Sequence, residues 1–168
     1  DRGGQWEHAR LGLAAEIFAE RERAVWTDVF LTGSFLTMSL YHFGLYLLRR
    51  KDRSSLYFGI LCFLILVRLL VTGERLAFQN FPDFPFWLGQ KLEYLSIYLA
   101  TPIFALLFSA SFREDFPRIV IQAALGIHIA LAVAVLLLPL YYFSQTLMVF
   151  FVCALLIAPF GIGCPLLS

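Results

Sequence analysis

Long apolar runs alternate with short polar segments along this chain. A helix that crosses the hydrocarbon core of a bilayer needs roughly 20 mostly apolar residues. Backbone polar groups in lipid must be satisfied within the segment itself, which favours helices over open strands. The pattern therefore predicts an all-α, polytopic transmembrane helix bundle. The predicted helices extend over about residues 25–48, 56–72, 87–112, 119–140 and 146–160.

Short polar connections separate these runs, at 49–55, 73–86, 113–118 and 141–145. Connections of this length place neighbouring helices antiparallel. The connection 73–86 is rich in Phe and Pro, and aromatic rings favour the membrane–water interface. We therefore expect it to lie along the membrane surface. Residues 1–24 carry nine charges and indicate a region outside the membrane, ahead of a helical membrane domain at 25–168.

The distribution of Lys and Arg predicts the orientation, because short cytoplasmic loops carry an excess of them. Arg113 and Arg118 lie two connections after the densest basic group and therefore on the same side. Four arginines precede the first helix on the opposite side, so the count is nearly balanced. We expect the N-terminus outside and a cytoplasmic positive cluster formed by Arg49, Arg50, Lys51 and Arg53.

The composition agrees with a membrane protein: 60% of the residues are hydrophobic and 15% are charged, against about 45–50% and about 25% in soluble domains. The net charge of +1 offers no general attraction for nucleic acid. The three cysteines fit neither a zinc site nor a disulfide framework. Catalytic and nucleotide-binding motifs such as G-x-S-x-G and H-E-x-x-H are absent from the sequence. We expect no metal, no cofactor and no enzyme activity in this chain.

Arg68 lies inside the second apolar run, where an arginine costs about 2.5–3.5 kcal/mol on insertion scales and is paired or functional by default. Glu93 lies at a similar depth on the next, antiparallel helix, since both residues are a few positions from the same connection. We predict an intramembrane ion pair between Arg68 and Glu93. Alternatively, Arg68 extends toward the interface and Glu93 faces interfacial water or pairs with Lys91.

Other polar residues in the apolar runs have structural interpretations. Asp28 is expected to act as a cap-like carboxylate near the start of the first helix, or as a polar site in the bundle. His42 and His128 are expected to be hydrogen-bonded packing residues, because no Cys or carboxylate lies at metal-ligand spacing from either. A face of small residues on the first helix is expected to pack closely on a neighbour. Its members are Gly33, Ser34, Thr37 and Gly44.

Motifs between residues 30 and 118 carry a family resemblance. The first run contains G-x-x-x-x-M-x-L-Y-H (33–42), and an Arg–Asp turn leads into L-Y-F (50–58). The second run ends in R-L-L-x-x-G-E (68–74), and the third contains K-L-E-Y-L (91–95) followed by Pro102. This segment resembles the membrane domain of bacterial seven-transmembrane receptors with diverse intracellular signalling modules (7TMR-DISM).

The resemblance implies an extracytoplasmic sensory domain ahead of the first helix, with residues 1–24 as its tail or linker. It also implies a cytoplasmic output domain after a seventh helix, so the chain is expected to hold five of seven helices. The expected function is that of a sensory and signal-transducing module in the bacterial inner membrane. The expected partners are the lipid bilayer, an unidentified extracytoplasmic ligand and the output domain. A homodimer is a candidate assembly. The alternative is a fragment of a small-solute transporter or channel.

Overall fold

The computed structural model describes residues 14–111, 118–139, 146–148 and 150, which are helical with short connections and contain no strand. The predicted all-α class is therefore confirmed for the described part of the chain. Residues 146–148 and 150 are also helical, and the rest of the predicted helix 146–160 lies outside the described residues. The helices are α1 (Ala14–Leu48), α2 (Arg53–Val71), α3 (Leu76–Asn80), α4 (Phe86–Ser111) and α5 (Arg118–Leu137).

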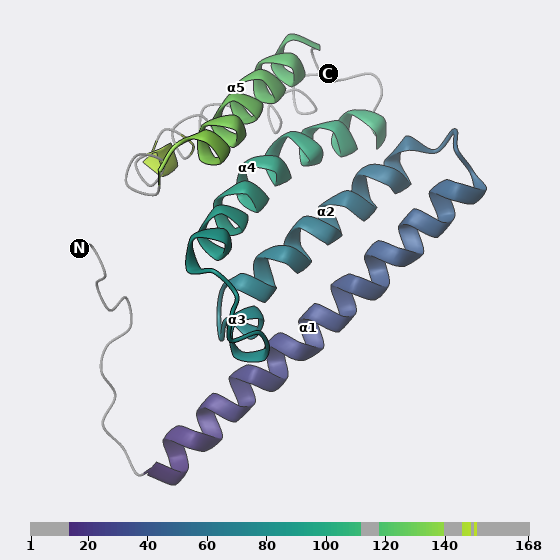
Figure 1. The fold of residues 1–168 in the computed structure, drawn as a ribbon. Coiled ribbons are helices and arrows are strands. Elements are labelled where there is room, and N and C mark those ends of the chain that lie inside the picture. Colours follow the sequence, from purple (N-terminus) through teal and green to yellow (C-terminus); the bar gives the residue numbers. More distant parts are fainter. Residues whose placement is uncertain (1–13, 112–117, 140–145, 149, 151–168) are drawn as a thin grey trace, which may run out of the picture.

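The long helices lie side by side in chain order (Figure 1). Helix α1 packs on α2, α2 on α4, and α4 on α5, while α1 and α4 are not in contact. The short helix α3 lies beside the last turn of α2 and the first turn of α4, and it contacts α1 and α2. We refer to this end of the helices as the α3 end and to the opposite end, with residues 49–52, as the turn end. The described helices thus form an open row in which α1 packs on one side only.

Helix α1 begins well before the apolar run that predicted it, at Ala14 rather than near Val25. Residues 14–24 are rich in Ala, Glu and Arg, which have high helix propensity in water. The apolar-run criterion detects only the lipid-compatible part of such a helix. With 35 residues, α1 is about 52 Å long at 1.5 Å per residue, which exceeds the ~30 Å hydrocarbon core of a bilayer.

At the turn end, Asp52 caps the first turn of α2. Its carboxylate accepts the hydroxyl hydrogens of Ser55 at 2.7 Å and Ser54 at 2.9 Å, and the backbone N–H of Ser55 at 3.5 Å. A carboxylate at a helix N-terminus satisfies free N–H groups and interacts favourably with the helix dipole. This arrangement ends α1 and starts α2 within four residues.

The Asp52 cap gives a testable pH dependence. The hydroxyl of Ser55, then that of Ser54, lowers the pKa of Asp52 below its ordinary value. Because the folded-state pKa is depressed, the contribution of the cap is complete above the ordinary carboxyl value and is lost as the pH falls through the lowered one. We expect an NMR titration of the Asp52 carboxyl carbon to have its midpoint below that of an unstructured Asp. In a Ser54→Ala/Ser55→Ala variant the midpoint should rise toward the ordinary value, because only the backbone N–H groups of these residues still lower the pKa of Asp52. An unchanged midpoint would contradict this cause.

The connection between α2 and α4 contains a helix that the sequence interpretation did not include. After α2, the backbone N–H of Arg75 bonds to the carbonyl of Thr72 at 3.0 Å, and this turn has a positive φ of 59° at Gly73. Arg75 also has a positive φ, 53°, and precedes α3. The turn reverses the direction of the chain. The Phe- and Pro-rich segment that follows packs on the first turn of α4.

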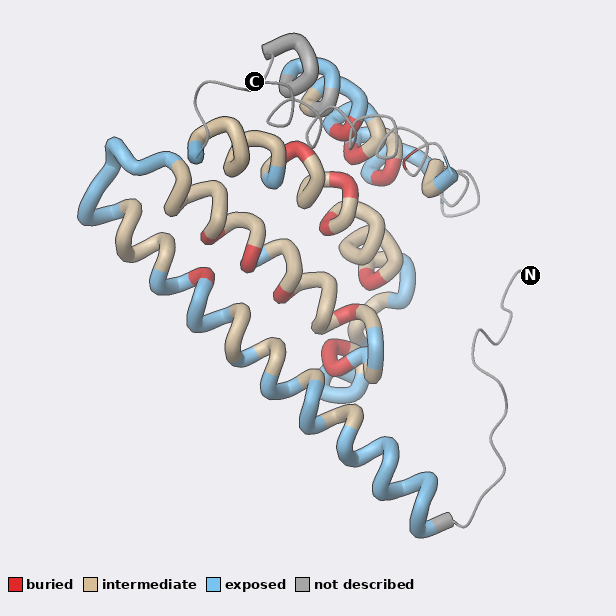
Figure 2. The backbone as a smooth tube through the Cα atoms, turned by 180° about the vertical axis from the view of Figure 1, so that it is seen from behind, coloured by how far each residue is buried: buried red, intermediate tan, exposed pale blue. Residues whose placement is uncertain are grey.

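Within the described part of the chain, two helices are long and apolar enough to cross a membrane, α2 and α4, and a shorter apolar stretch covers Leu125–Leu137. Only 22% of the apolar window of α2 and 17% of that of α4 are buried, whereas the core helix of a soluble protein is mostly buried. Figure 2 shows that buried positions are few on the long helices and that α1 is exposed over most of its length. These surfaces indicate membrane association. The five-span arrangement stays a prediction.

Candidate functional site

Helices α1 and α2 approach each other closely near Ser39. Ser39 is 1% exposed, and its hydroxyl donates to the main-chain carbonyl of Gly59 at 3.0 Å. A β-carbon on Gly59 would lie 3.0 Å from the Phe43 ring, so glycine permits this approach. Next to it, Nδ1 of His42 hydrogen-bonds the carbonyl of Met38 at 2.9 Å and the imidazole ring packs on Phe58 at 4.4 Å. The interpretation of His42 as a hydrogen-bonded packing residue is confirmed.

At the α3 end, Asp28 bridges α1 to the turn that follows α2. Its carboxylate accepts the backbone N–H of Glu74 at 3.0 Å. Asp28 lies 14 residues after the start of α1, so the cap-like interpretation is wrong for its own helix. The carboxylate instead holds a turn 46 residues further along the chain. Arg21 lies 3.8 Å from the Glu74 carboxylate, but both side chains are partly exposed and such pairs contribute little.

Arg68 reaches the helix that the sequence predicted, but through the backbone. One of its terminal nitrogens donates to the main-chain carbonyl of Glu93 at 3.1 Å. The same carbonyl accepts the Ser96 hydroxyl at 2.8 Å, and Ser96 is buried. The structure thus joins α2 and α4 at Arg68 and Glu93. The ion pair with the Glu93 carboxylate stays a prediction.

A cation–aromatic cluster covers the α3 end. The Arg75 guanidinium lies 5.9 Å from the centroids of both the Phe78 and Phe86 rings. Phe78 also packs edge-on against Phe84 at 5.1 Å and occupies the space in which a β-carbon on Gly89 would lie. These contacts hold α3 against the first turn of α4.

A cluster of buried residues joins α4 to α5 and to the described residues near 146–148 and 150. Tyr98 and Val135 are fully buried and form a cluster with Phe150. The Tyr98 hydroxyl hydrogen-bonds that of Thr146 at 2.7 Å. His128, also fully buried, packs edge-on against Phe150 at 5.5 Å. The expected packing role of His128 is therefore confirmed, and its expected hydrogen bond stays a prediction.

Lys91 supports the same junction from the α3 end. Its ammonium donates to the carbonyl of Leu136, in the last turn of α5, at 2.8 Å and lies 5.8 Å from the Trp87 ring centroid. Cations at a helix C-terminus satisfy carbonyls that have no partner within the helix. Lys91 thus connects α4 with α5, a different role from the pairing with Glu93 weighed from the sequence.

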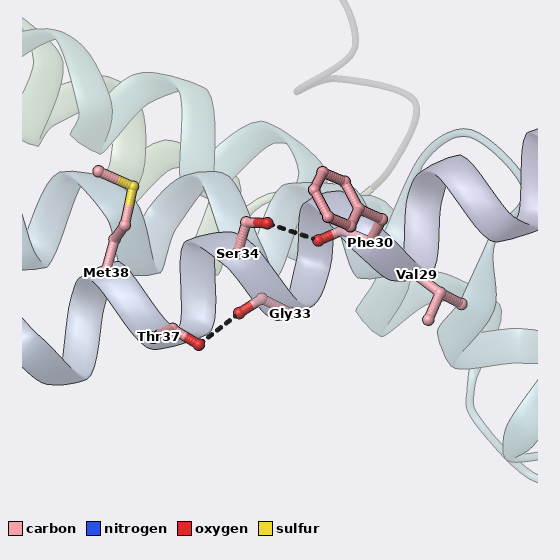
Figure 3. Close-up of a pocket in the computed structure, with 6 residues that line it drawn as sticks. All are labelled: Val29, Phe30, Gly33, Ser34, Thr37 and Met38. Carbon is pink, nitrogen blue, oxygen red and sulfur yellow. Dashed lines mark hydrogen bonds between the residues drawn. The ribbon is translucent and has the colours of Figure 1, made fainter.

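The small-residue face of α1 has no neighbour in the described part of the chain. A β-carbon placed at Gly33 or Gly44 would meet no atom of another described segment within 4 Å. The Ser34 and Thr37 hydroxyls donate to carbonyls one turn back on α1 (Figure 3), at 2.8 and 2.9 Å. The described residues therefore do not make the predicted close packing. The face forms a shallow hollow lined by Val29, Phe30, Gly33, Ser34, Thr37 and Met38.

The predicted basic cluster lies at the turn end, away from the polar contacts of the α3 end. Arg49, Arg50, Lys51 and Arg53 are all exposed. Their assignment to the cytoplasm stays a prediction. Among the described residues, no group of three or more His, Cys, Asp or Glu side chains could hold a metal ion.

Many side-chain hydrogen bonds of the described helices return to a carbonyl of the same helix, but others join separate segments, among them Ser39 to Gly59, Arg68 to Glu93, Glu74 to Asp28 and Lys91 to Leu136. Sequence reasoning missed the roles of Tyr98, Lys91 and Glu74. For Lys91 the sequence did contain a signal, because a polar residue at the end of an apolar run can contact a neighbouring helix. The contact from Asp28 to Glu74 had none, because its acceptor and donor lie 46 residues apart.

Comparison with known proteins identifies the family. A search of curated proteins and a search of solved structures each returned no match. The family model described as 7TM diverse intracellular signalling (7TMR-DISM) matches residues 25–168, which is most of the chain. The resembling motifs lie on the elements described above, at the α1–α2 contact and in the region of Arg68 and Glu93. This chain therefore belongs to the 7TM diverse intracellular signalling family of membrane domains.

Proposed function

We propose that this chain is a transmembrane signal-transducing module that couples an extracytoplasmic stimulus to a cytoplasmic output domain. The observation that carries the proposal, together with the family, is the continuity of α1 from Ala14 to Leu48. A single helix of about 52 Å extends from a charged segment through an apolar segment to the basic turn. It can transmit a displacement, a tilt or a rotation along its whole length without a hinge.

The proposed orientation places the N-terminal end of α1 outside and the turn end in the cytoplasm of a bacterial cell. The exposed basic residues Arg49, Arg50, Lys51 and Arg53 support this, because positive residues accumulate in short cytoplasmic loops. The protein would then be a multi-pass inner-membrane protein. We assign no catalytic step to the chain itself, and the stimulus would shift an equilibrium between two helix arrangements by binding them with different affinity.

An insertion series in α1 tests the proposal in the full-length parent protein. One alanine inserted between Arg23 and Ala24 rotates the N-terminal segment by about 100° relative to the membrane part, whereas seven alanines restore the phase to within about 20°. We expect the single insertion to alter the signalling output at equal membrane level. The seven-residue insertion is the matched control and should retain an output close to that of the wild type.

Equal output from all three proteins would contradict the proposal, because the output would then not depend on the continuity of α1. The transporter alternative makes a different prediction, uptake of a small solute by proteoliposomes that contain the chain. That uptake together with phase-independent output would favour the alternative.

A further inference from the structure

Helix α1 is attached to its neighbours at two separate levels. Near its middle, Ser39 donates to the Gly59 carbonyl of α2 at 3.0 Å. Toward the α3 end, Asp28 accepts the N–H of Glu74 at 3.0 Å. The two α1 residues are eleven positions apart, or about 16 Å along the helix. Two attachments at this distance define the tilt of α1 relative to α2.

The Ser39 level has the properties of a fixed point. Ser39 and Gly59 are both buried, and glycine at 59 permits the close approach, because a β-carbon there would lie 3.0 Å from the Phe43 ring. Close contacts of small residues between membrane helices are held by van der Waals packing together with the hydrogen bond. Rotation about this point is less costly than separation at it.

The Asp28 level has the properties of a releasable contact. It depends on one hydrogen bond between a carboxylate and a backbone N–H at a partly buried site. The nearby Arg21–Glu74 pair at 3.8 Å is partly solvent-exposed and adds little. The approach requires glycine at position 73, because a β-carbon there would lie 2.6 Å from the carboxylate and the φ of +59° favours glycine. A tilt of α1 of about 5° around Ser39 would move Asp28 by roughly 1.4 Å, enough to break the bond.

The turn that Asp28 holds is itself connected to α2 and α4. The backbone N–H and the hydroxyl of Thr72 both donate to the carbonyl of Arg68, at 2.9 and 2.7 Å. The Arg68 side chain donates in turn to the carbonyl of Glu93 on α4. Hydrogen bonds joined by the covalent chain at residues 72–74 and at Arg68 therefore lead from Asp28 on α1 to α4, although α1 and α4 are not in contact.

We propose that Asp28 and the backbone amide of Glu74 form a latch that fixes the tilt of α1 about Ser39. Movement of the N-terminal end of α1 opens the latch and releases the Thr72–Arg68–Glu93 contacts from α1. The use of this latch in signalling rests on the proposed function. The existence of the latch depends only on the geometry of α1 and the turn.

Distances between spin labels in the 168-residue chain reconstituted in lipid vesicles test the latch. The background replaces the three native cysteines by alanine. One label pair, at Phe18→Cys and Asp83→Cys, reports on the α3 end, and both positions are exposed. A second pair, at Leu48→Cys and Ser111→Cys, reports on the turn end, and these positions are exposed as well.

We expect Asp28→Ala to broaden the distance distribution of the α3-end pair and to shift its mean by about 1–2 Å or more, the size of helix shifts in switching proteins. Gly73→Ala disturbs the same contact from the turn, because the added β-carbon would clash with the Asp28 carboxylate. It should produce the same shift. The two together should do no more than the larger single effect. Asp28→Asn keeps a neutral acceptor and should produce a smaller shift. Thr27→Ala is the matched control, because its hydroxyl bonds only to the Arg23 carbonyl.

Distributions of Asp28→Ala and Gly73→Ala that coincide with that of the wild type would overturn the latch. So would a shift of equal size at the turn-end pair, because the substitution would then loosen the whole chain. Since the labels report geometry and not output, the two proposals fail separately. A latch that opens without any change of output in the parent would remove the signalling role and leave the latch.

Discussion

Tyr98→Ala is expected to cause the largest loss of stability of any single substitution considered for this chain. Tyr98 is fully buried and its ring packs on Phe150 at a centroid distance of 5.1 Å, next to Val135 of α5. Truncating a buried aromatic residue leaves a cavity and costs about 3–5 kcal/mol in soluble cores. Lipid is as apolar as a core, so packing carries the effect here. We therefore expect a loss of about 3 kcal/mol, the low end of that range.

Tyr98→Phe separates the ring from the hydroxyl. It keeps the packing and loses only the bond to Thr146 at 2.7 Å. Side-chain hydrogen bonds between membrane helices average about 0.6 kcal/mol, so this variant should lose roughly a fifth of the effect of alanine. Thr146→Val should lose about as much as Tyr98→Phe, and the double variant should lose no more than either single one.

Unfolding by SDS titration from mixed micelles, followed by circular dichroism, measures these differences. The prediction would be wrong if Tyr98→Ala and Tyr98→Phe were equally stable, because the cluster of Tyr98, Val135 and Phe150 would then not hold α4 and α5 together. Met148→Ala is a control in the same region, since Met148 is 77% exposed.

The sequence predicted what depends on hydropathy and left open what depends on tertiary contacts. The four described long helices lie where apolar runs occur, because lipid selects helices at such runs. Two helical segments were not predicted. The N-terminal extension of α1 is polar and is stabilised by its helix propensity. Helix α3 is short and is stabilised by packing on Gly89. Neither leaves a mark in a search for runs of about 20 apolar residues.

The candidate site shows the same division at the level of single residues. The sequence predicted that Arg68 contacts the helix that contains Glu93, because both residues lie a few positions from the same connection and therefore at a similar depth in the membrane. The structure shows this contact. Which oxygen of Glu93 accepts the bond depends on side-chain rotation and could not be predicted. The partner of Asp28 depends on the positive φ of Gly73, which brings a backbone N–H to a distant carboxylate. A sequence gives glycine there without saying which residue approaches it.

Substitutions at Arg68 and Glu93 distinguish the backbone contact from the predicted ion pair. Arg68→Leu removes the donor to the Glu93 carbonyl, and a hydrogen bond to a charged group contributes about 1.5–3 kcal/mol. We expect Arg68→Leu to lower the free energy of unfolding in SDS titration by about 1.5 kcal/mol, the low end of that range because Ser96 still occupies the same carbonyl. The same substitution should improve insertion of the α2 segment by the translocon, because it removes an arginine that costs about 2.5–3.5 kcal/mol. Stability and insertion should therefore change in opposite directions.

Glu93→Gln is the decisive partner variant, because it neutralises the carboxylate and leaves the main-chain carbonyl in place. If the backbone oxygen is the acceptor that joins α2 to α4, Glu93→Gln should change the stability by less than about 0.5 kcal/mol, as substitutions without a lost contact do. A loss as large as that of Arg68→Leu would instead show that the carboxylate carries the interaction and that the ion pair forms. Arg68→Lys completes the set: a single ammonium on a shorter side chain should reach the carbonyl less well than the guanidinium and recover only part of the stability. The order wild type, Glu93→Gln, Arg68→Lys, Arg68→Leu, from most to least stable, is the result that the contact at 3.1 Å requires.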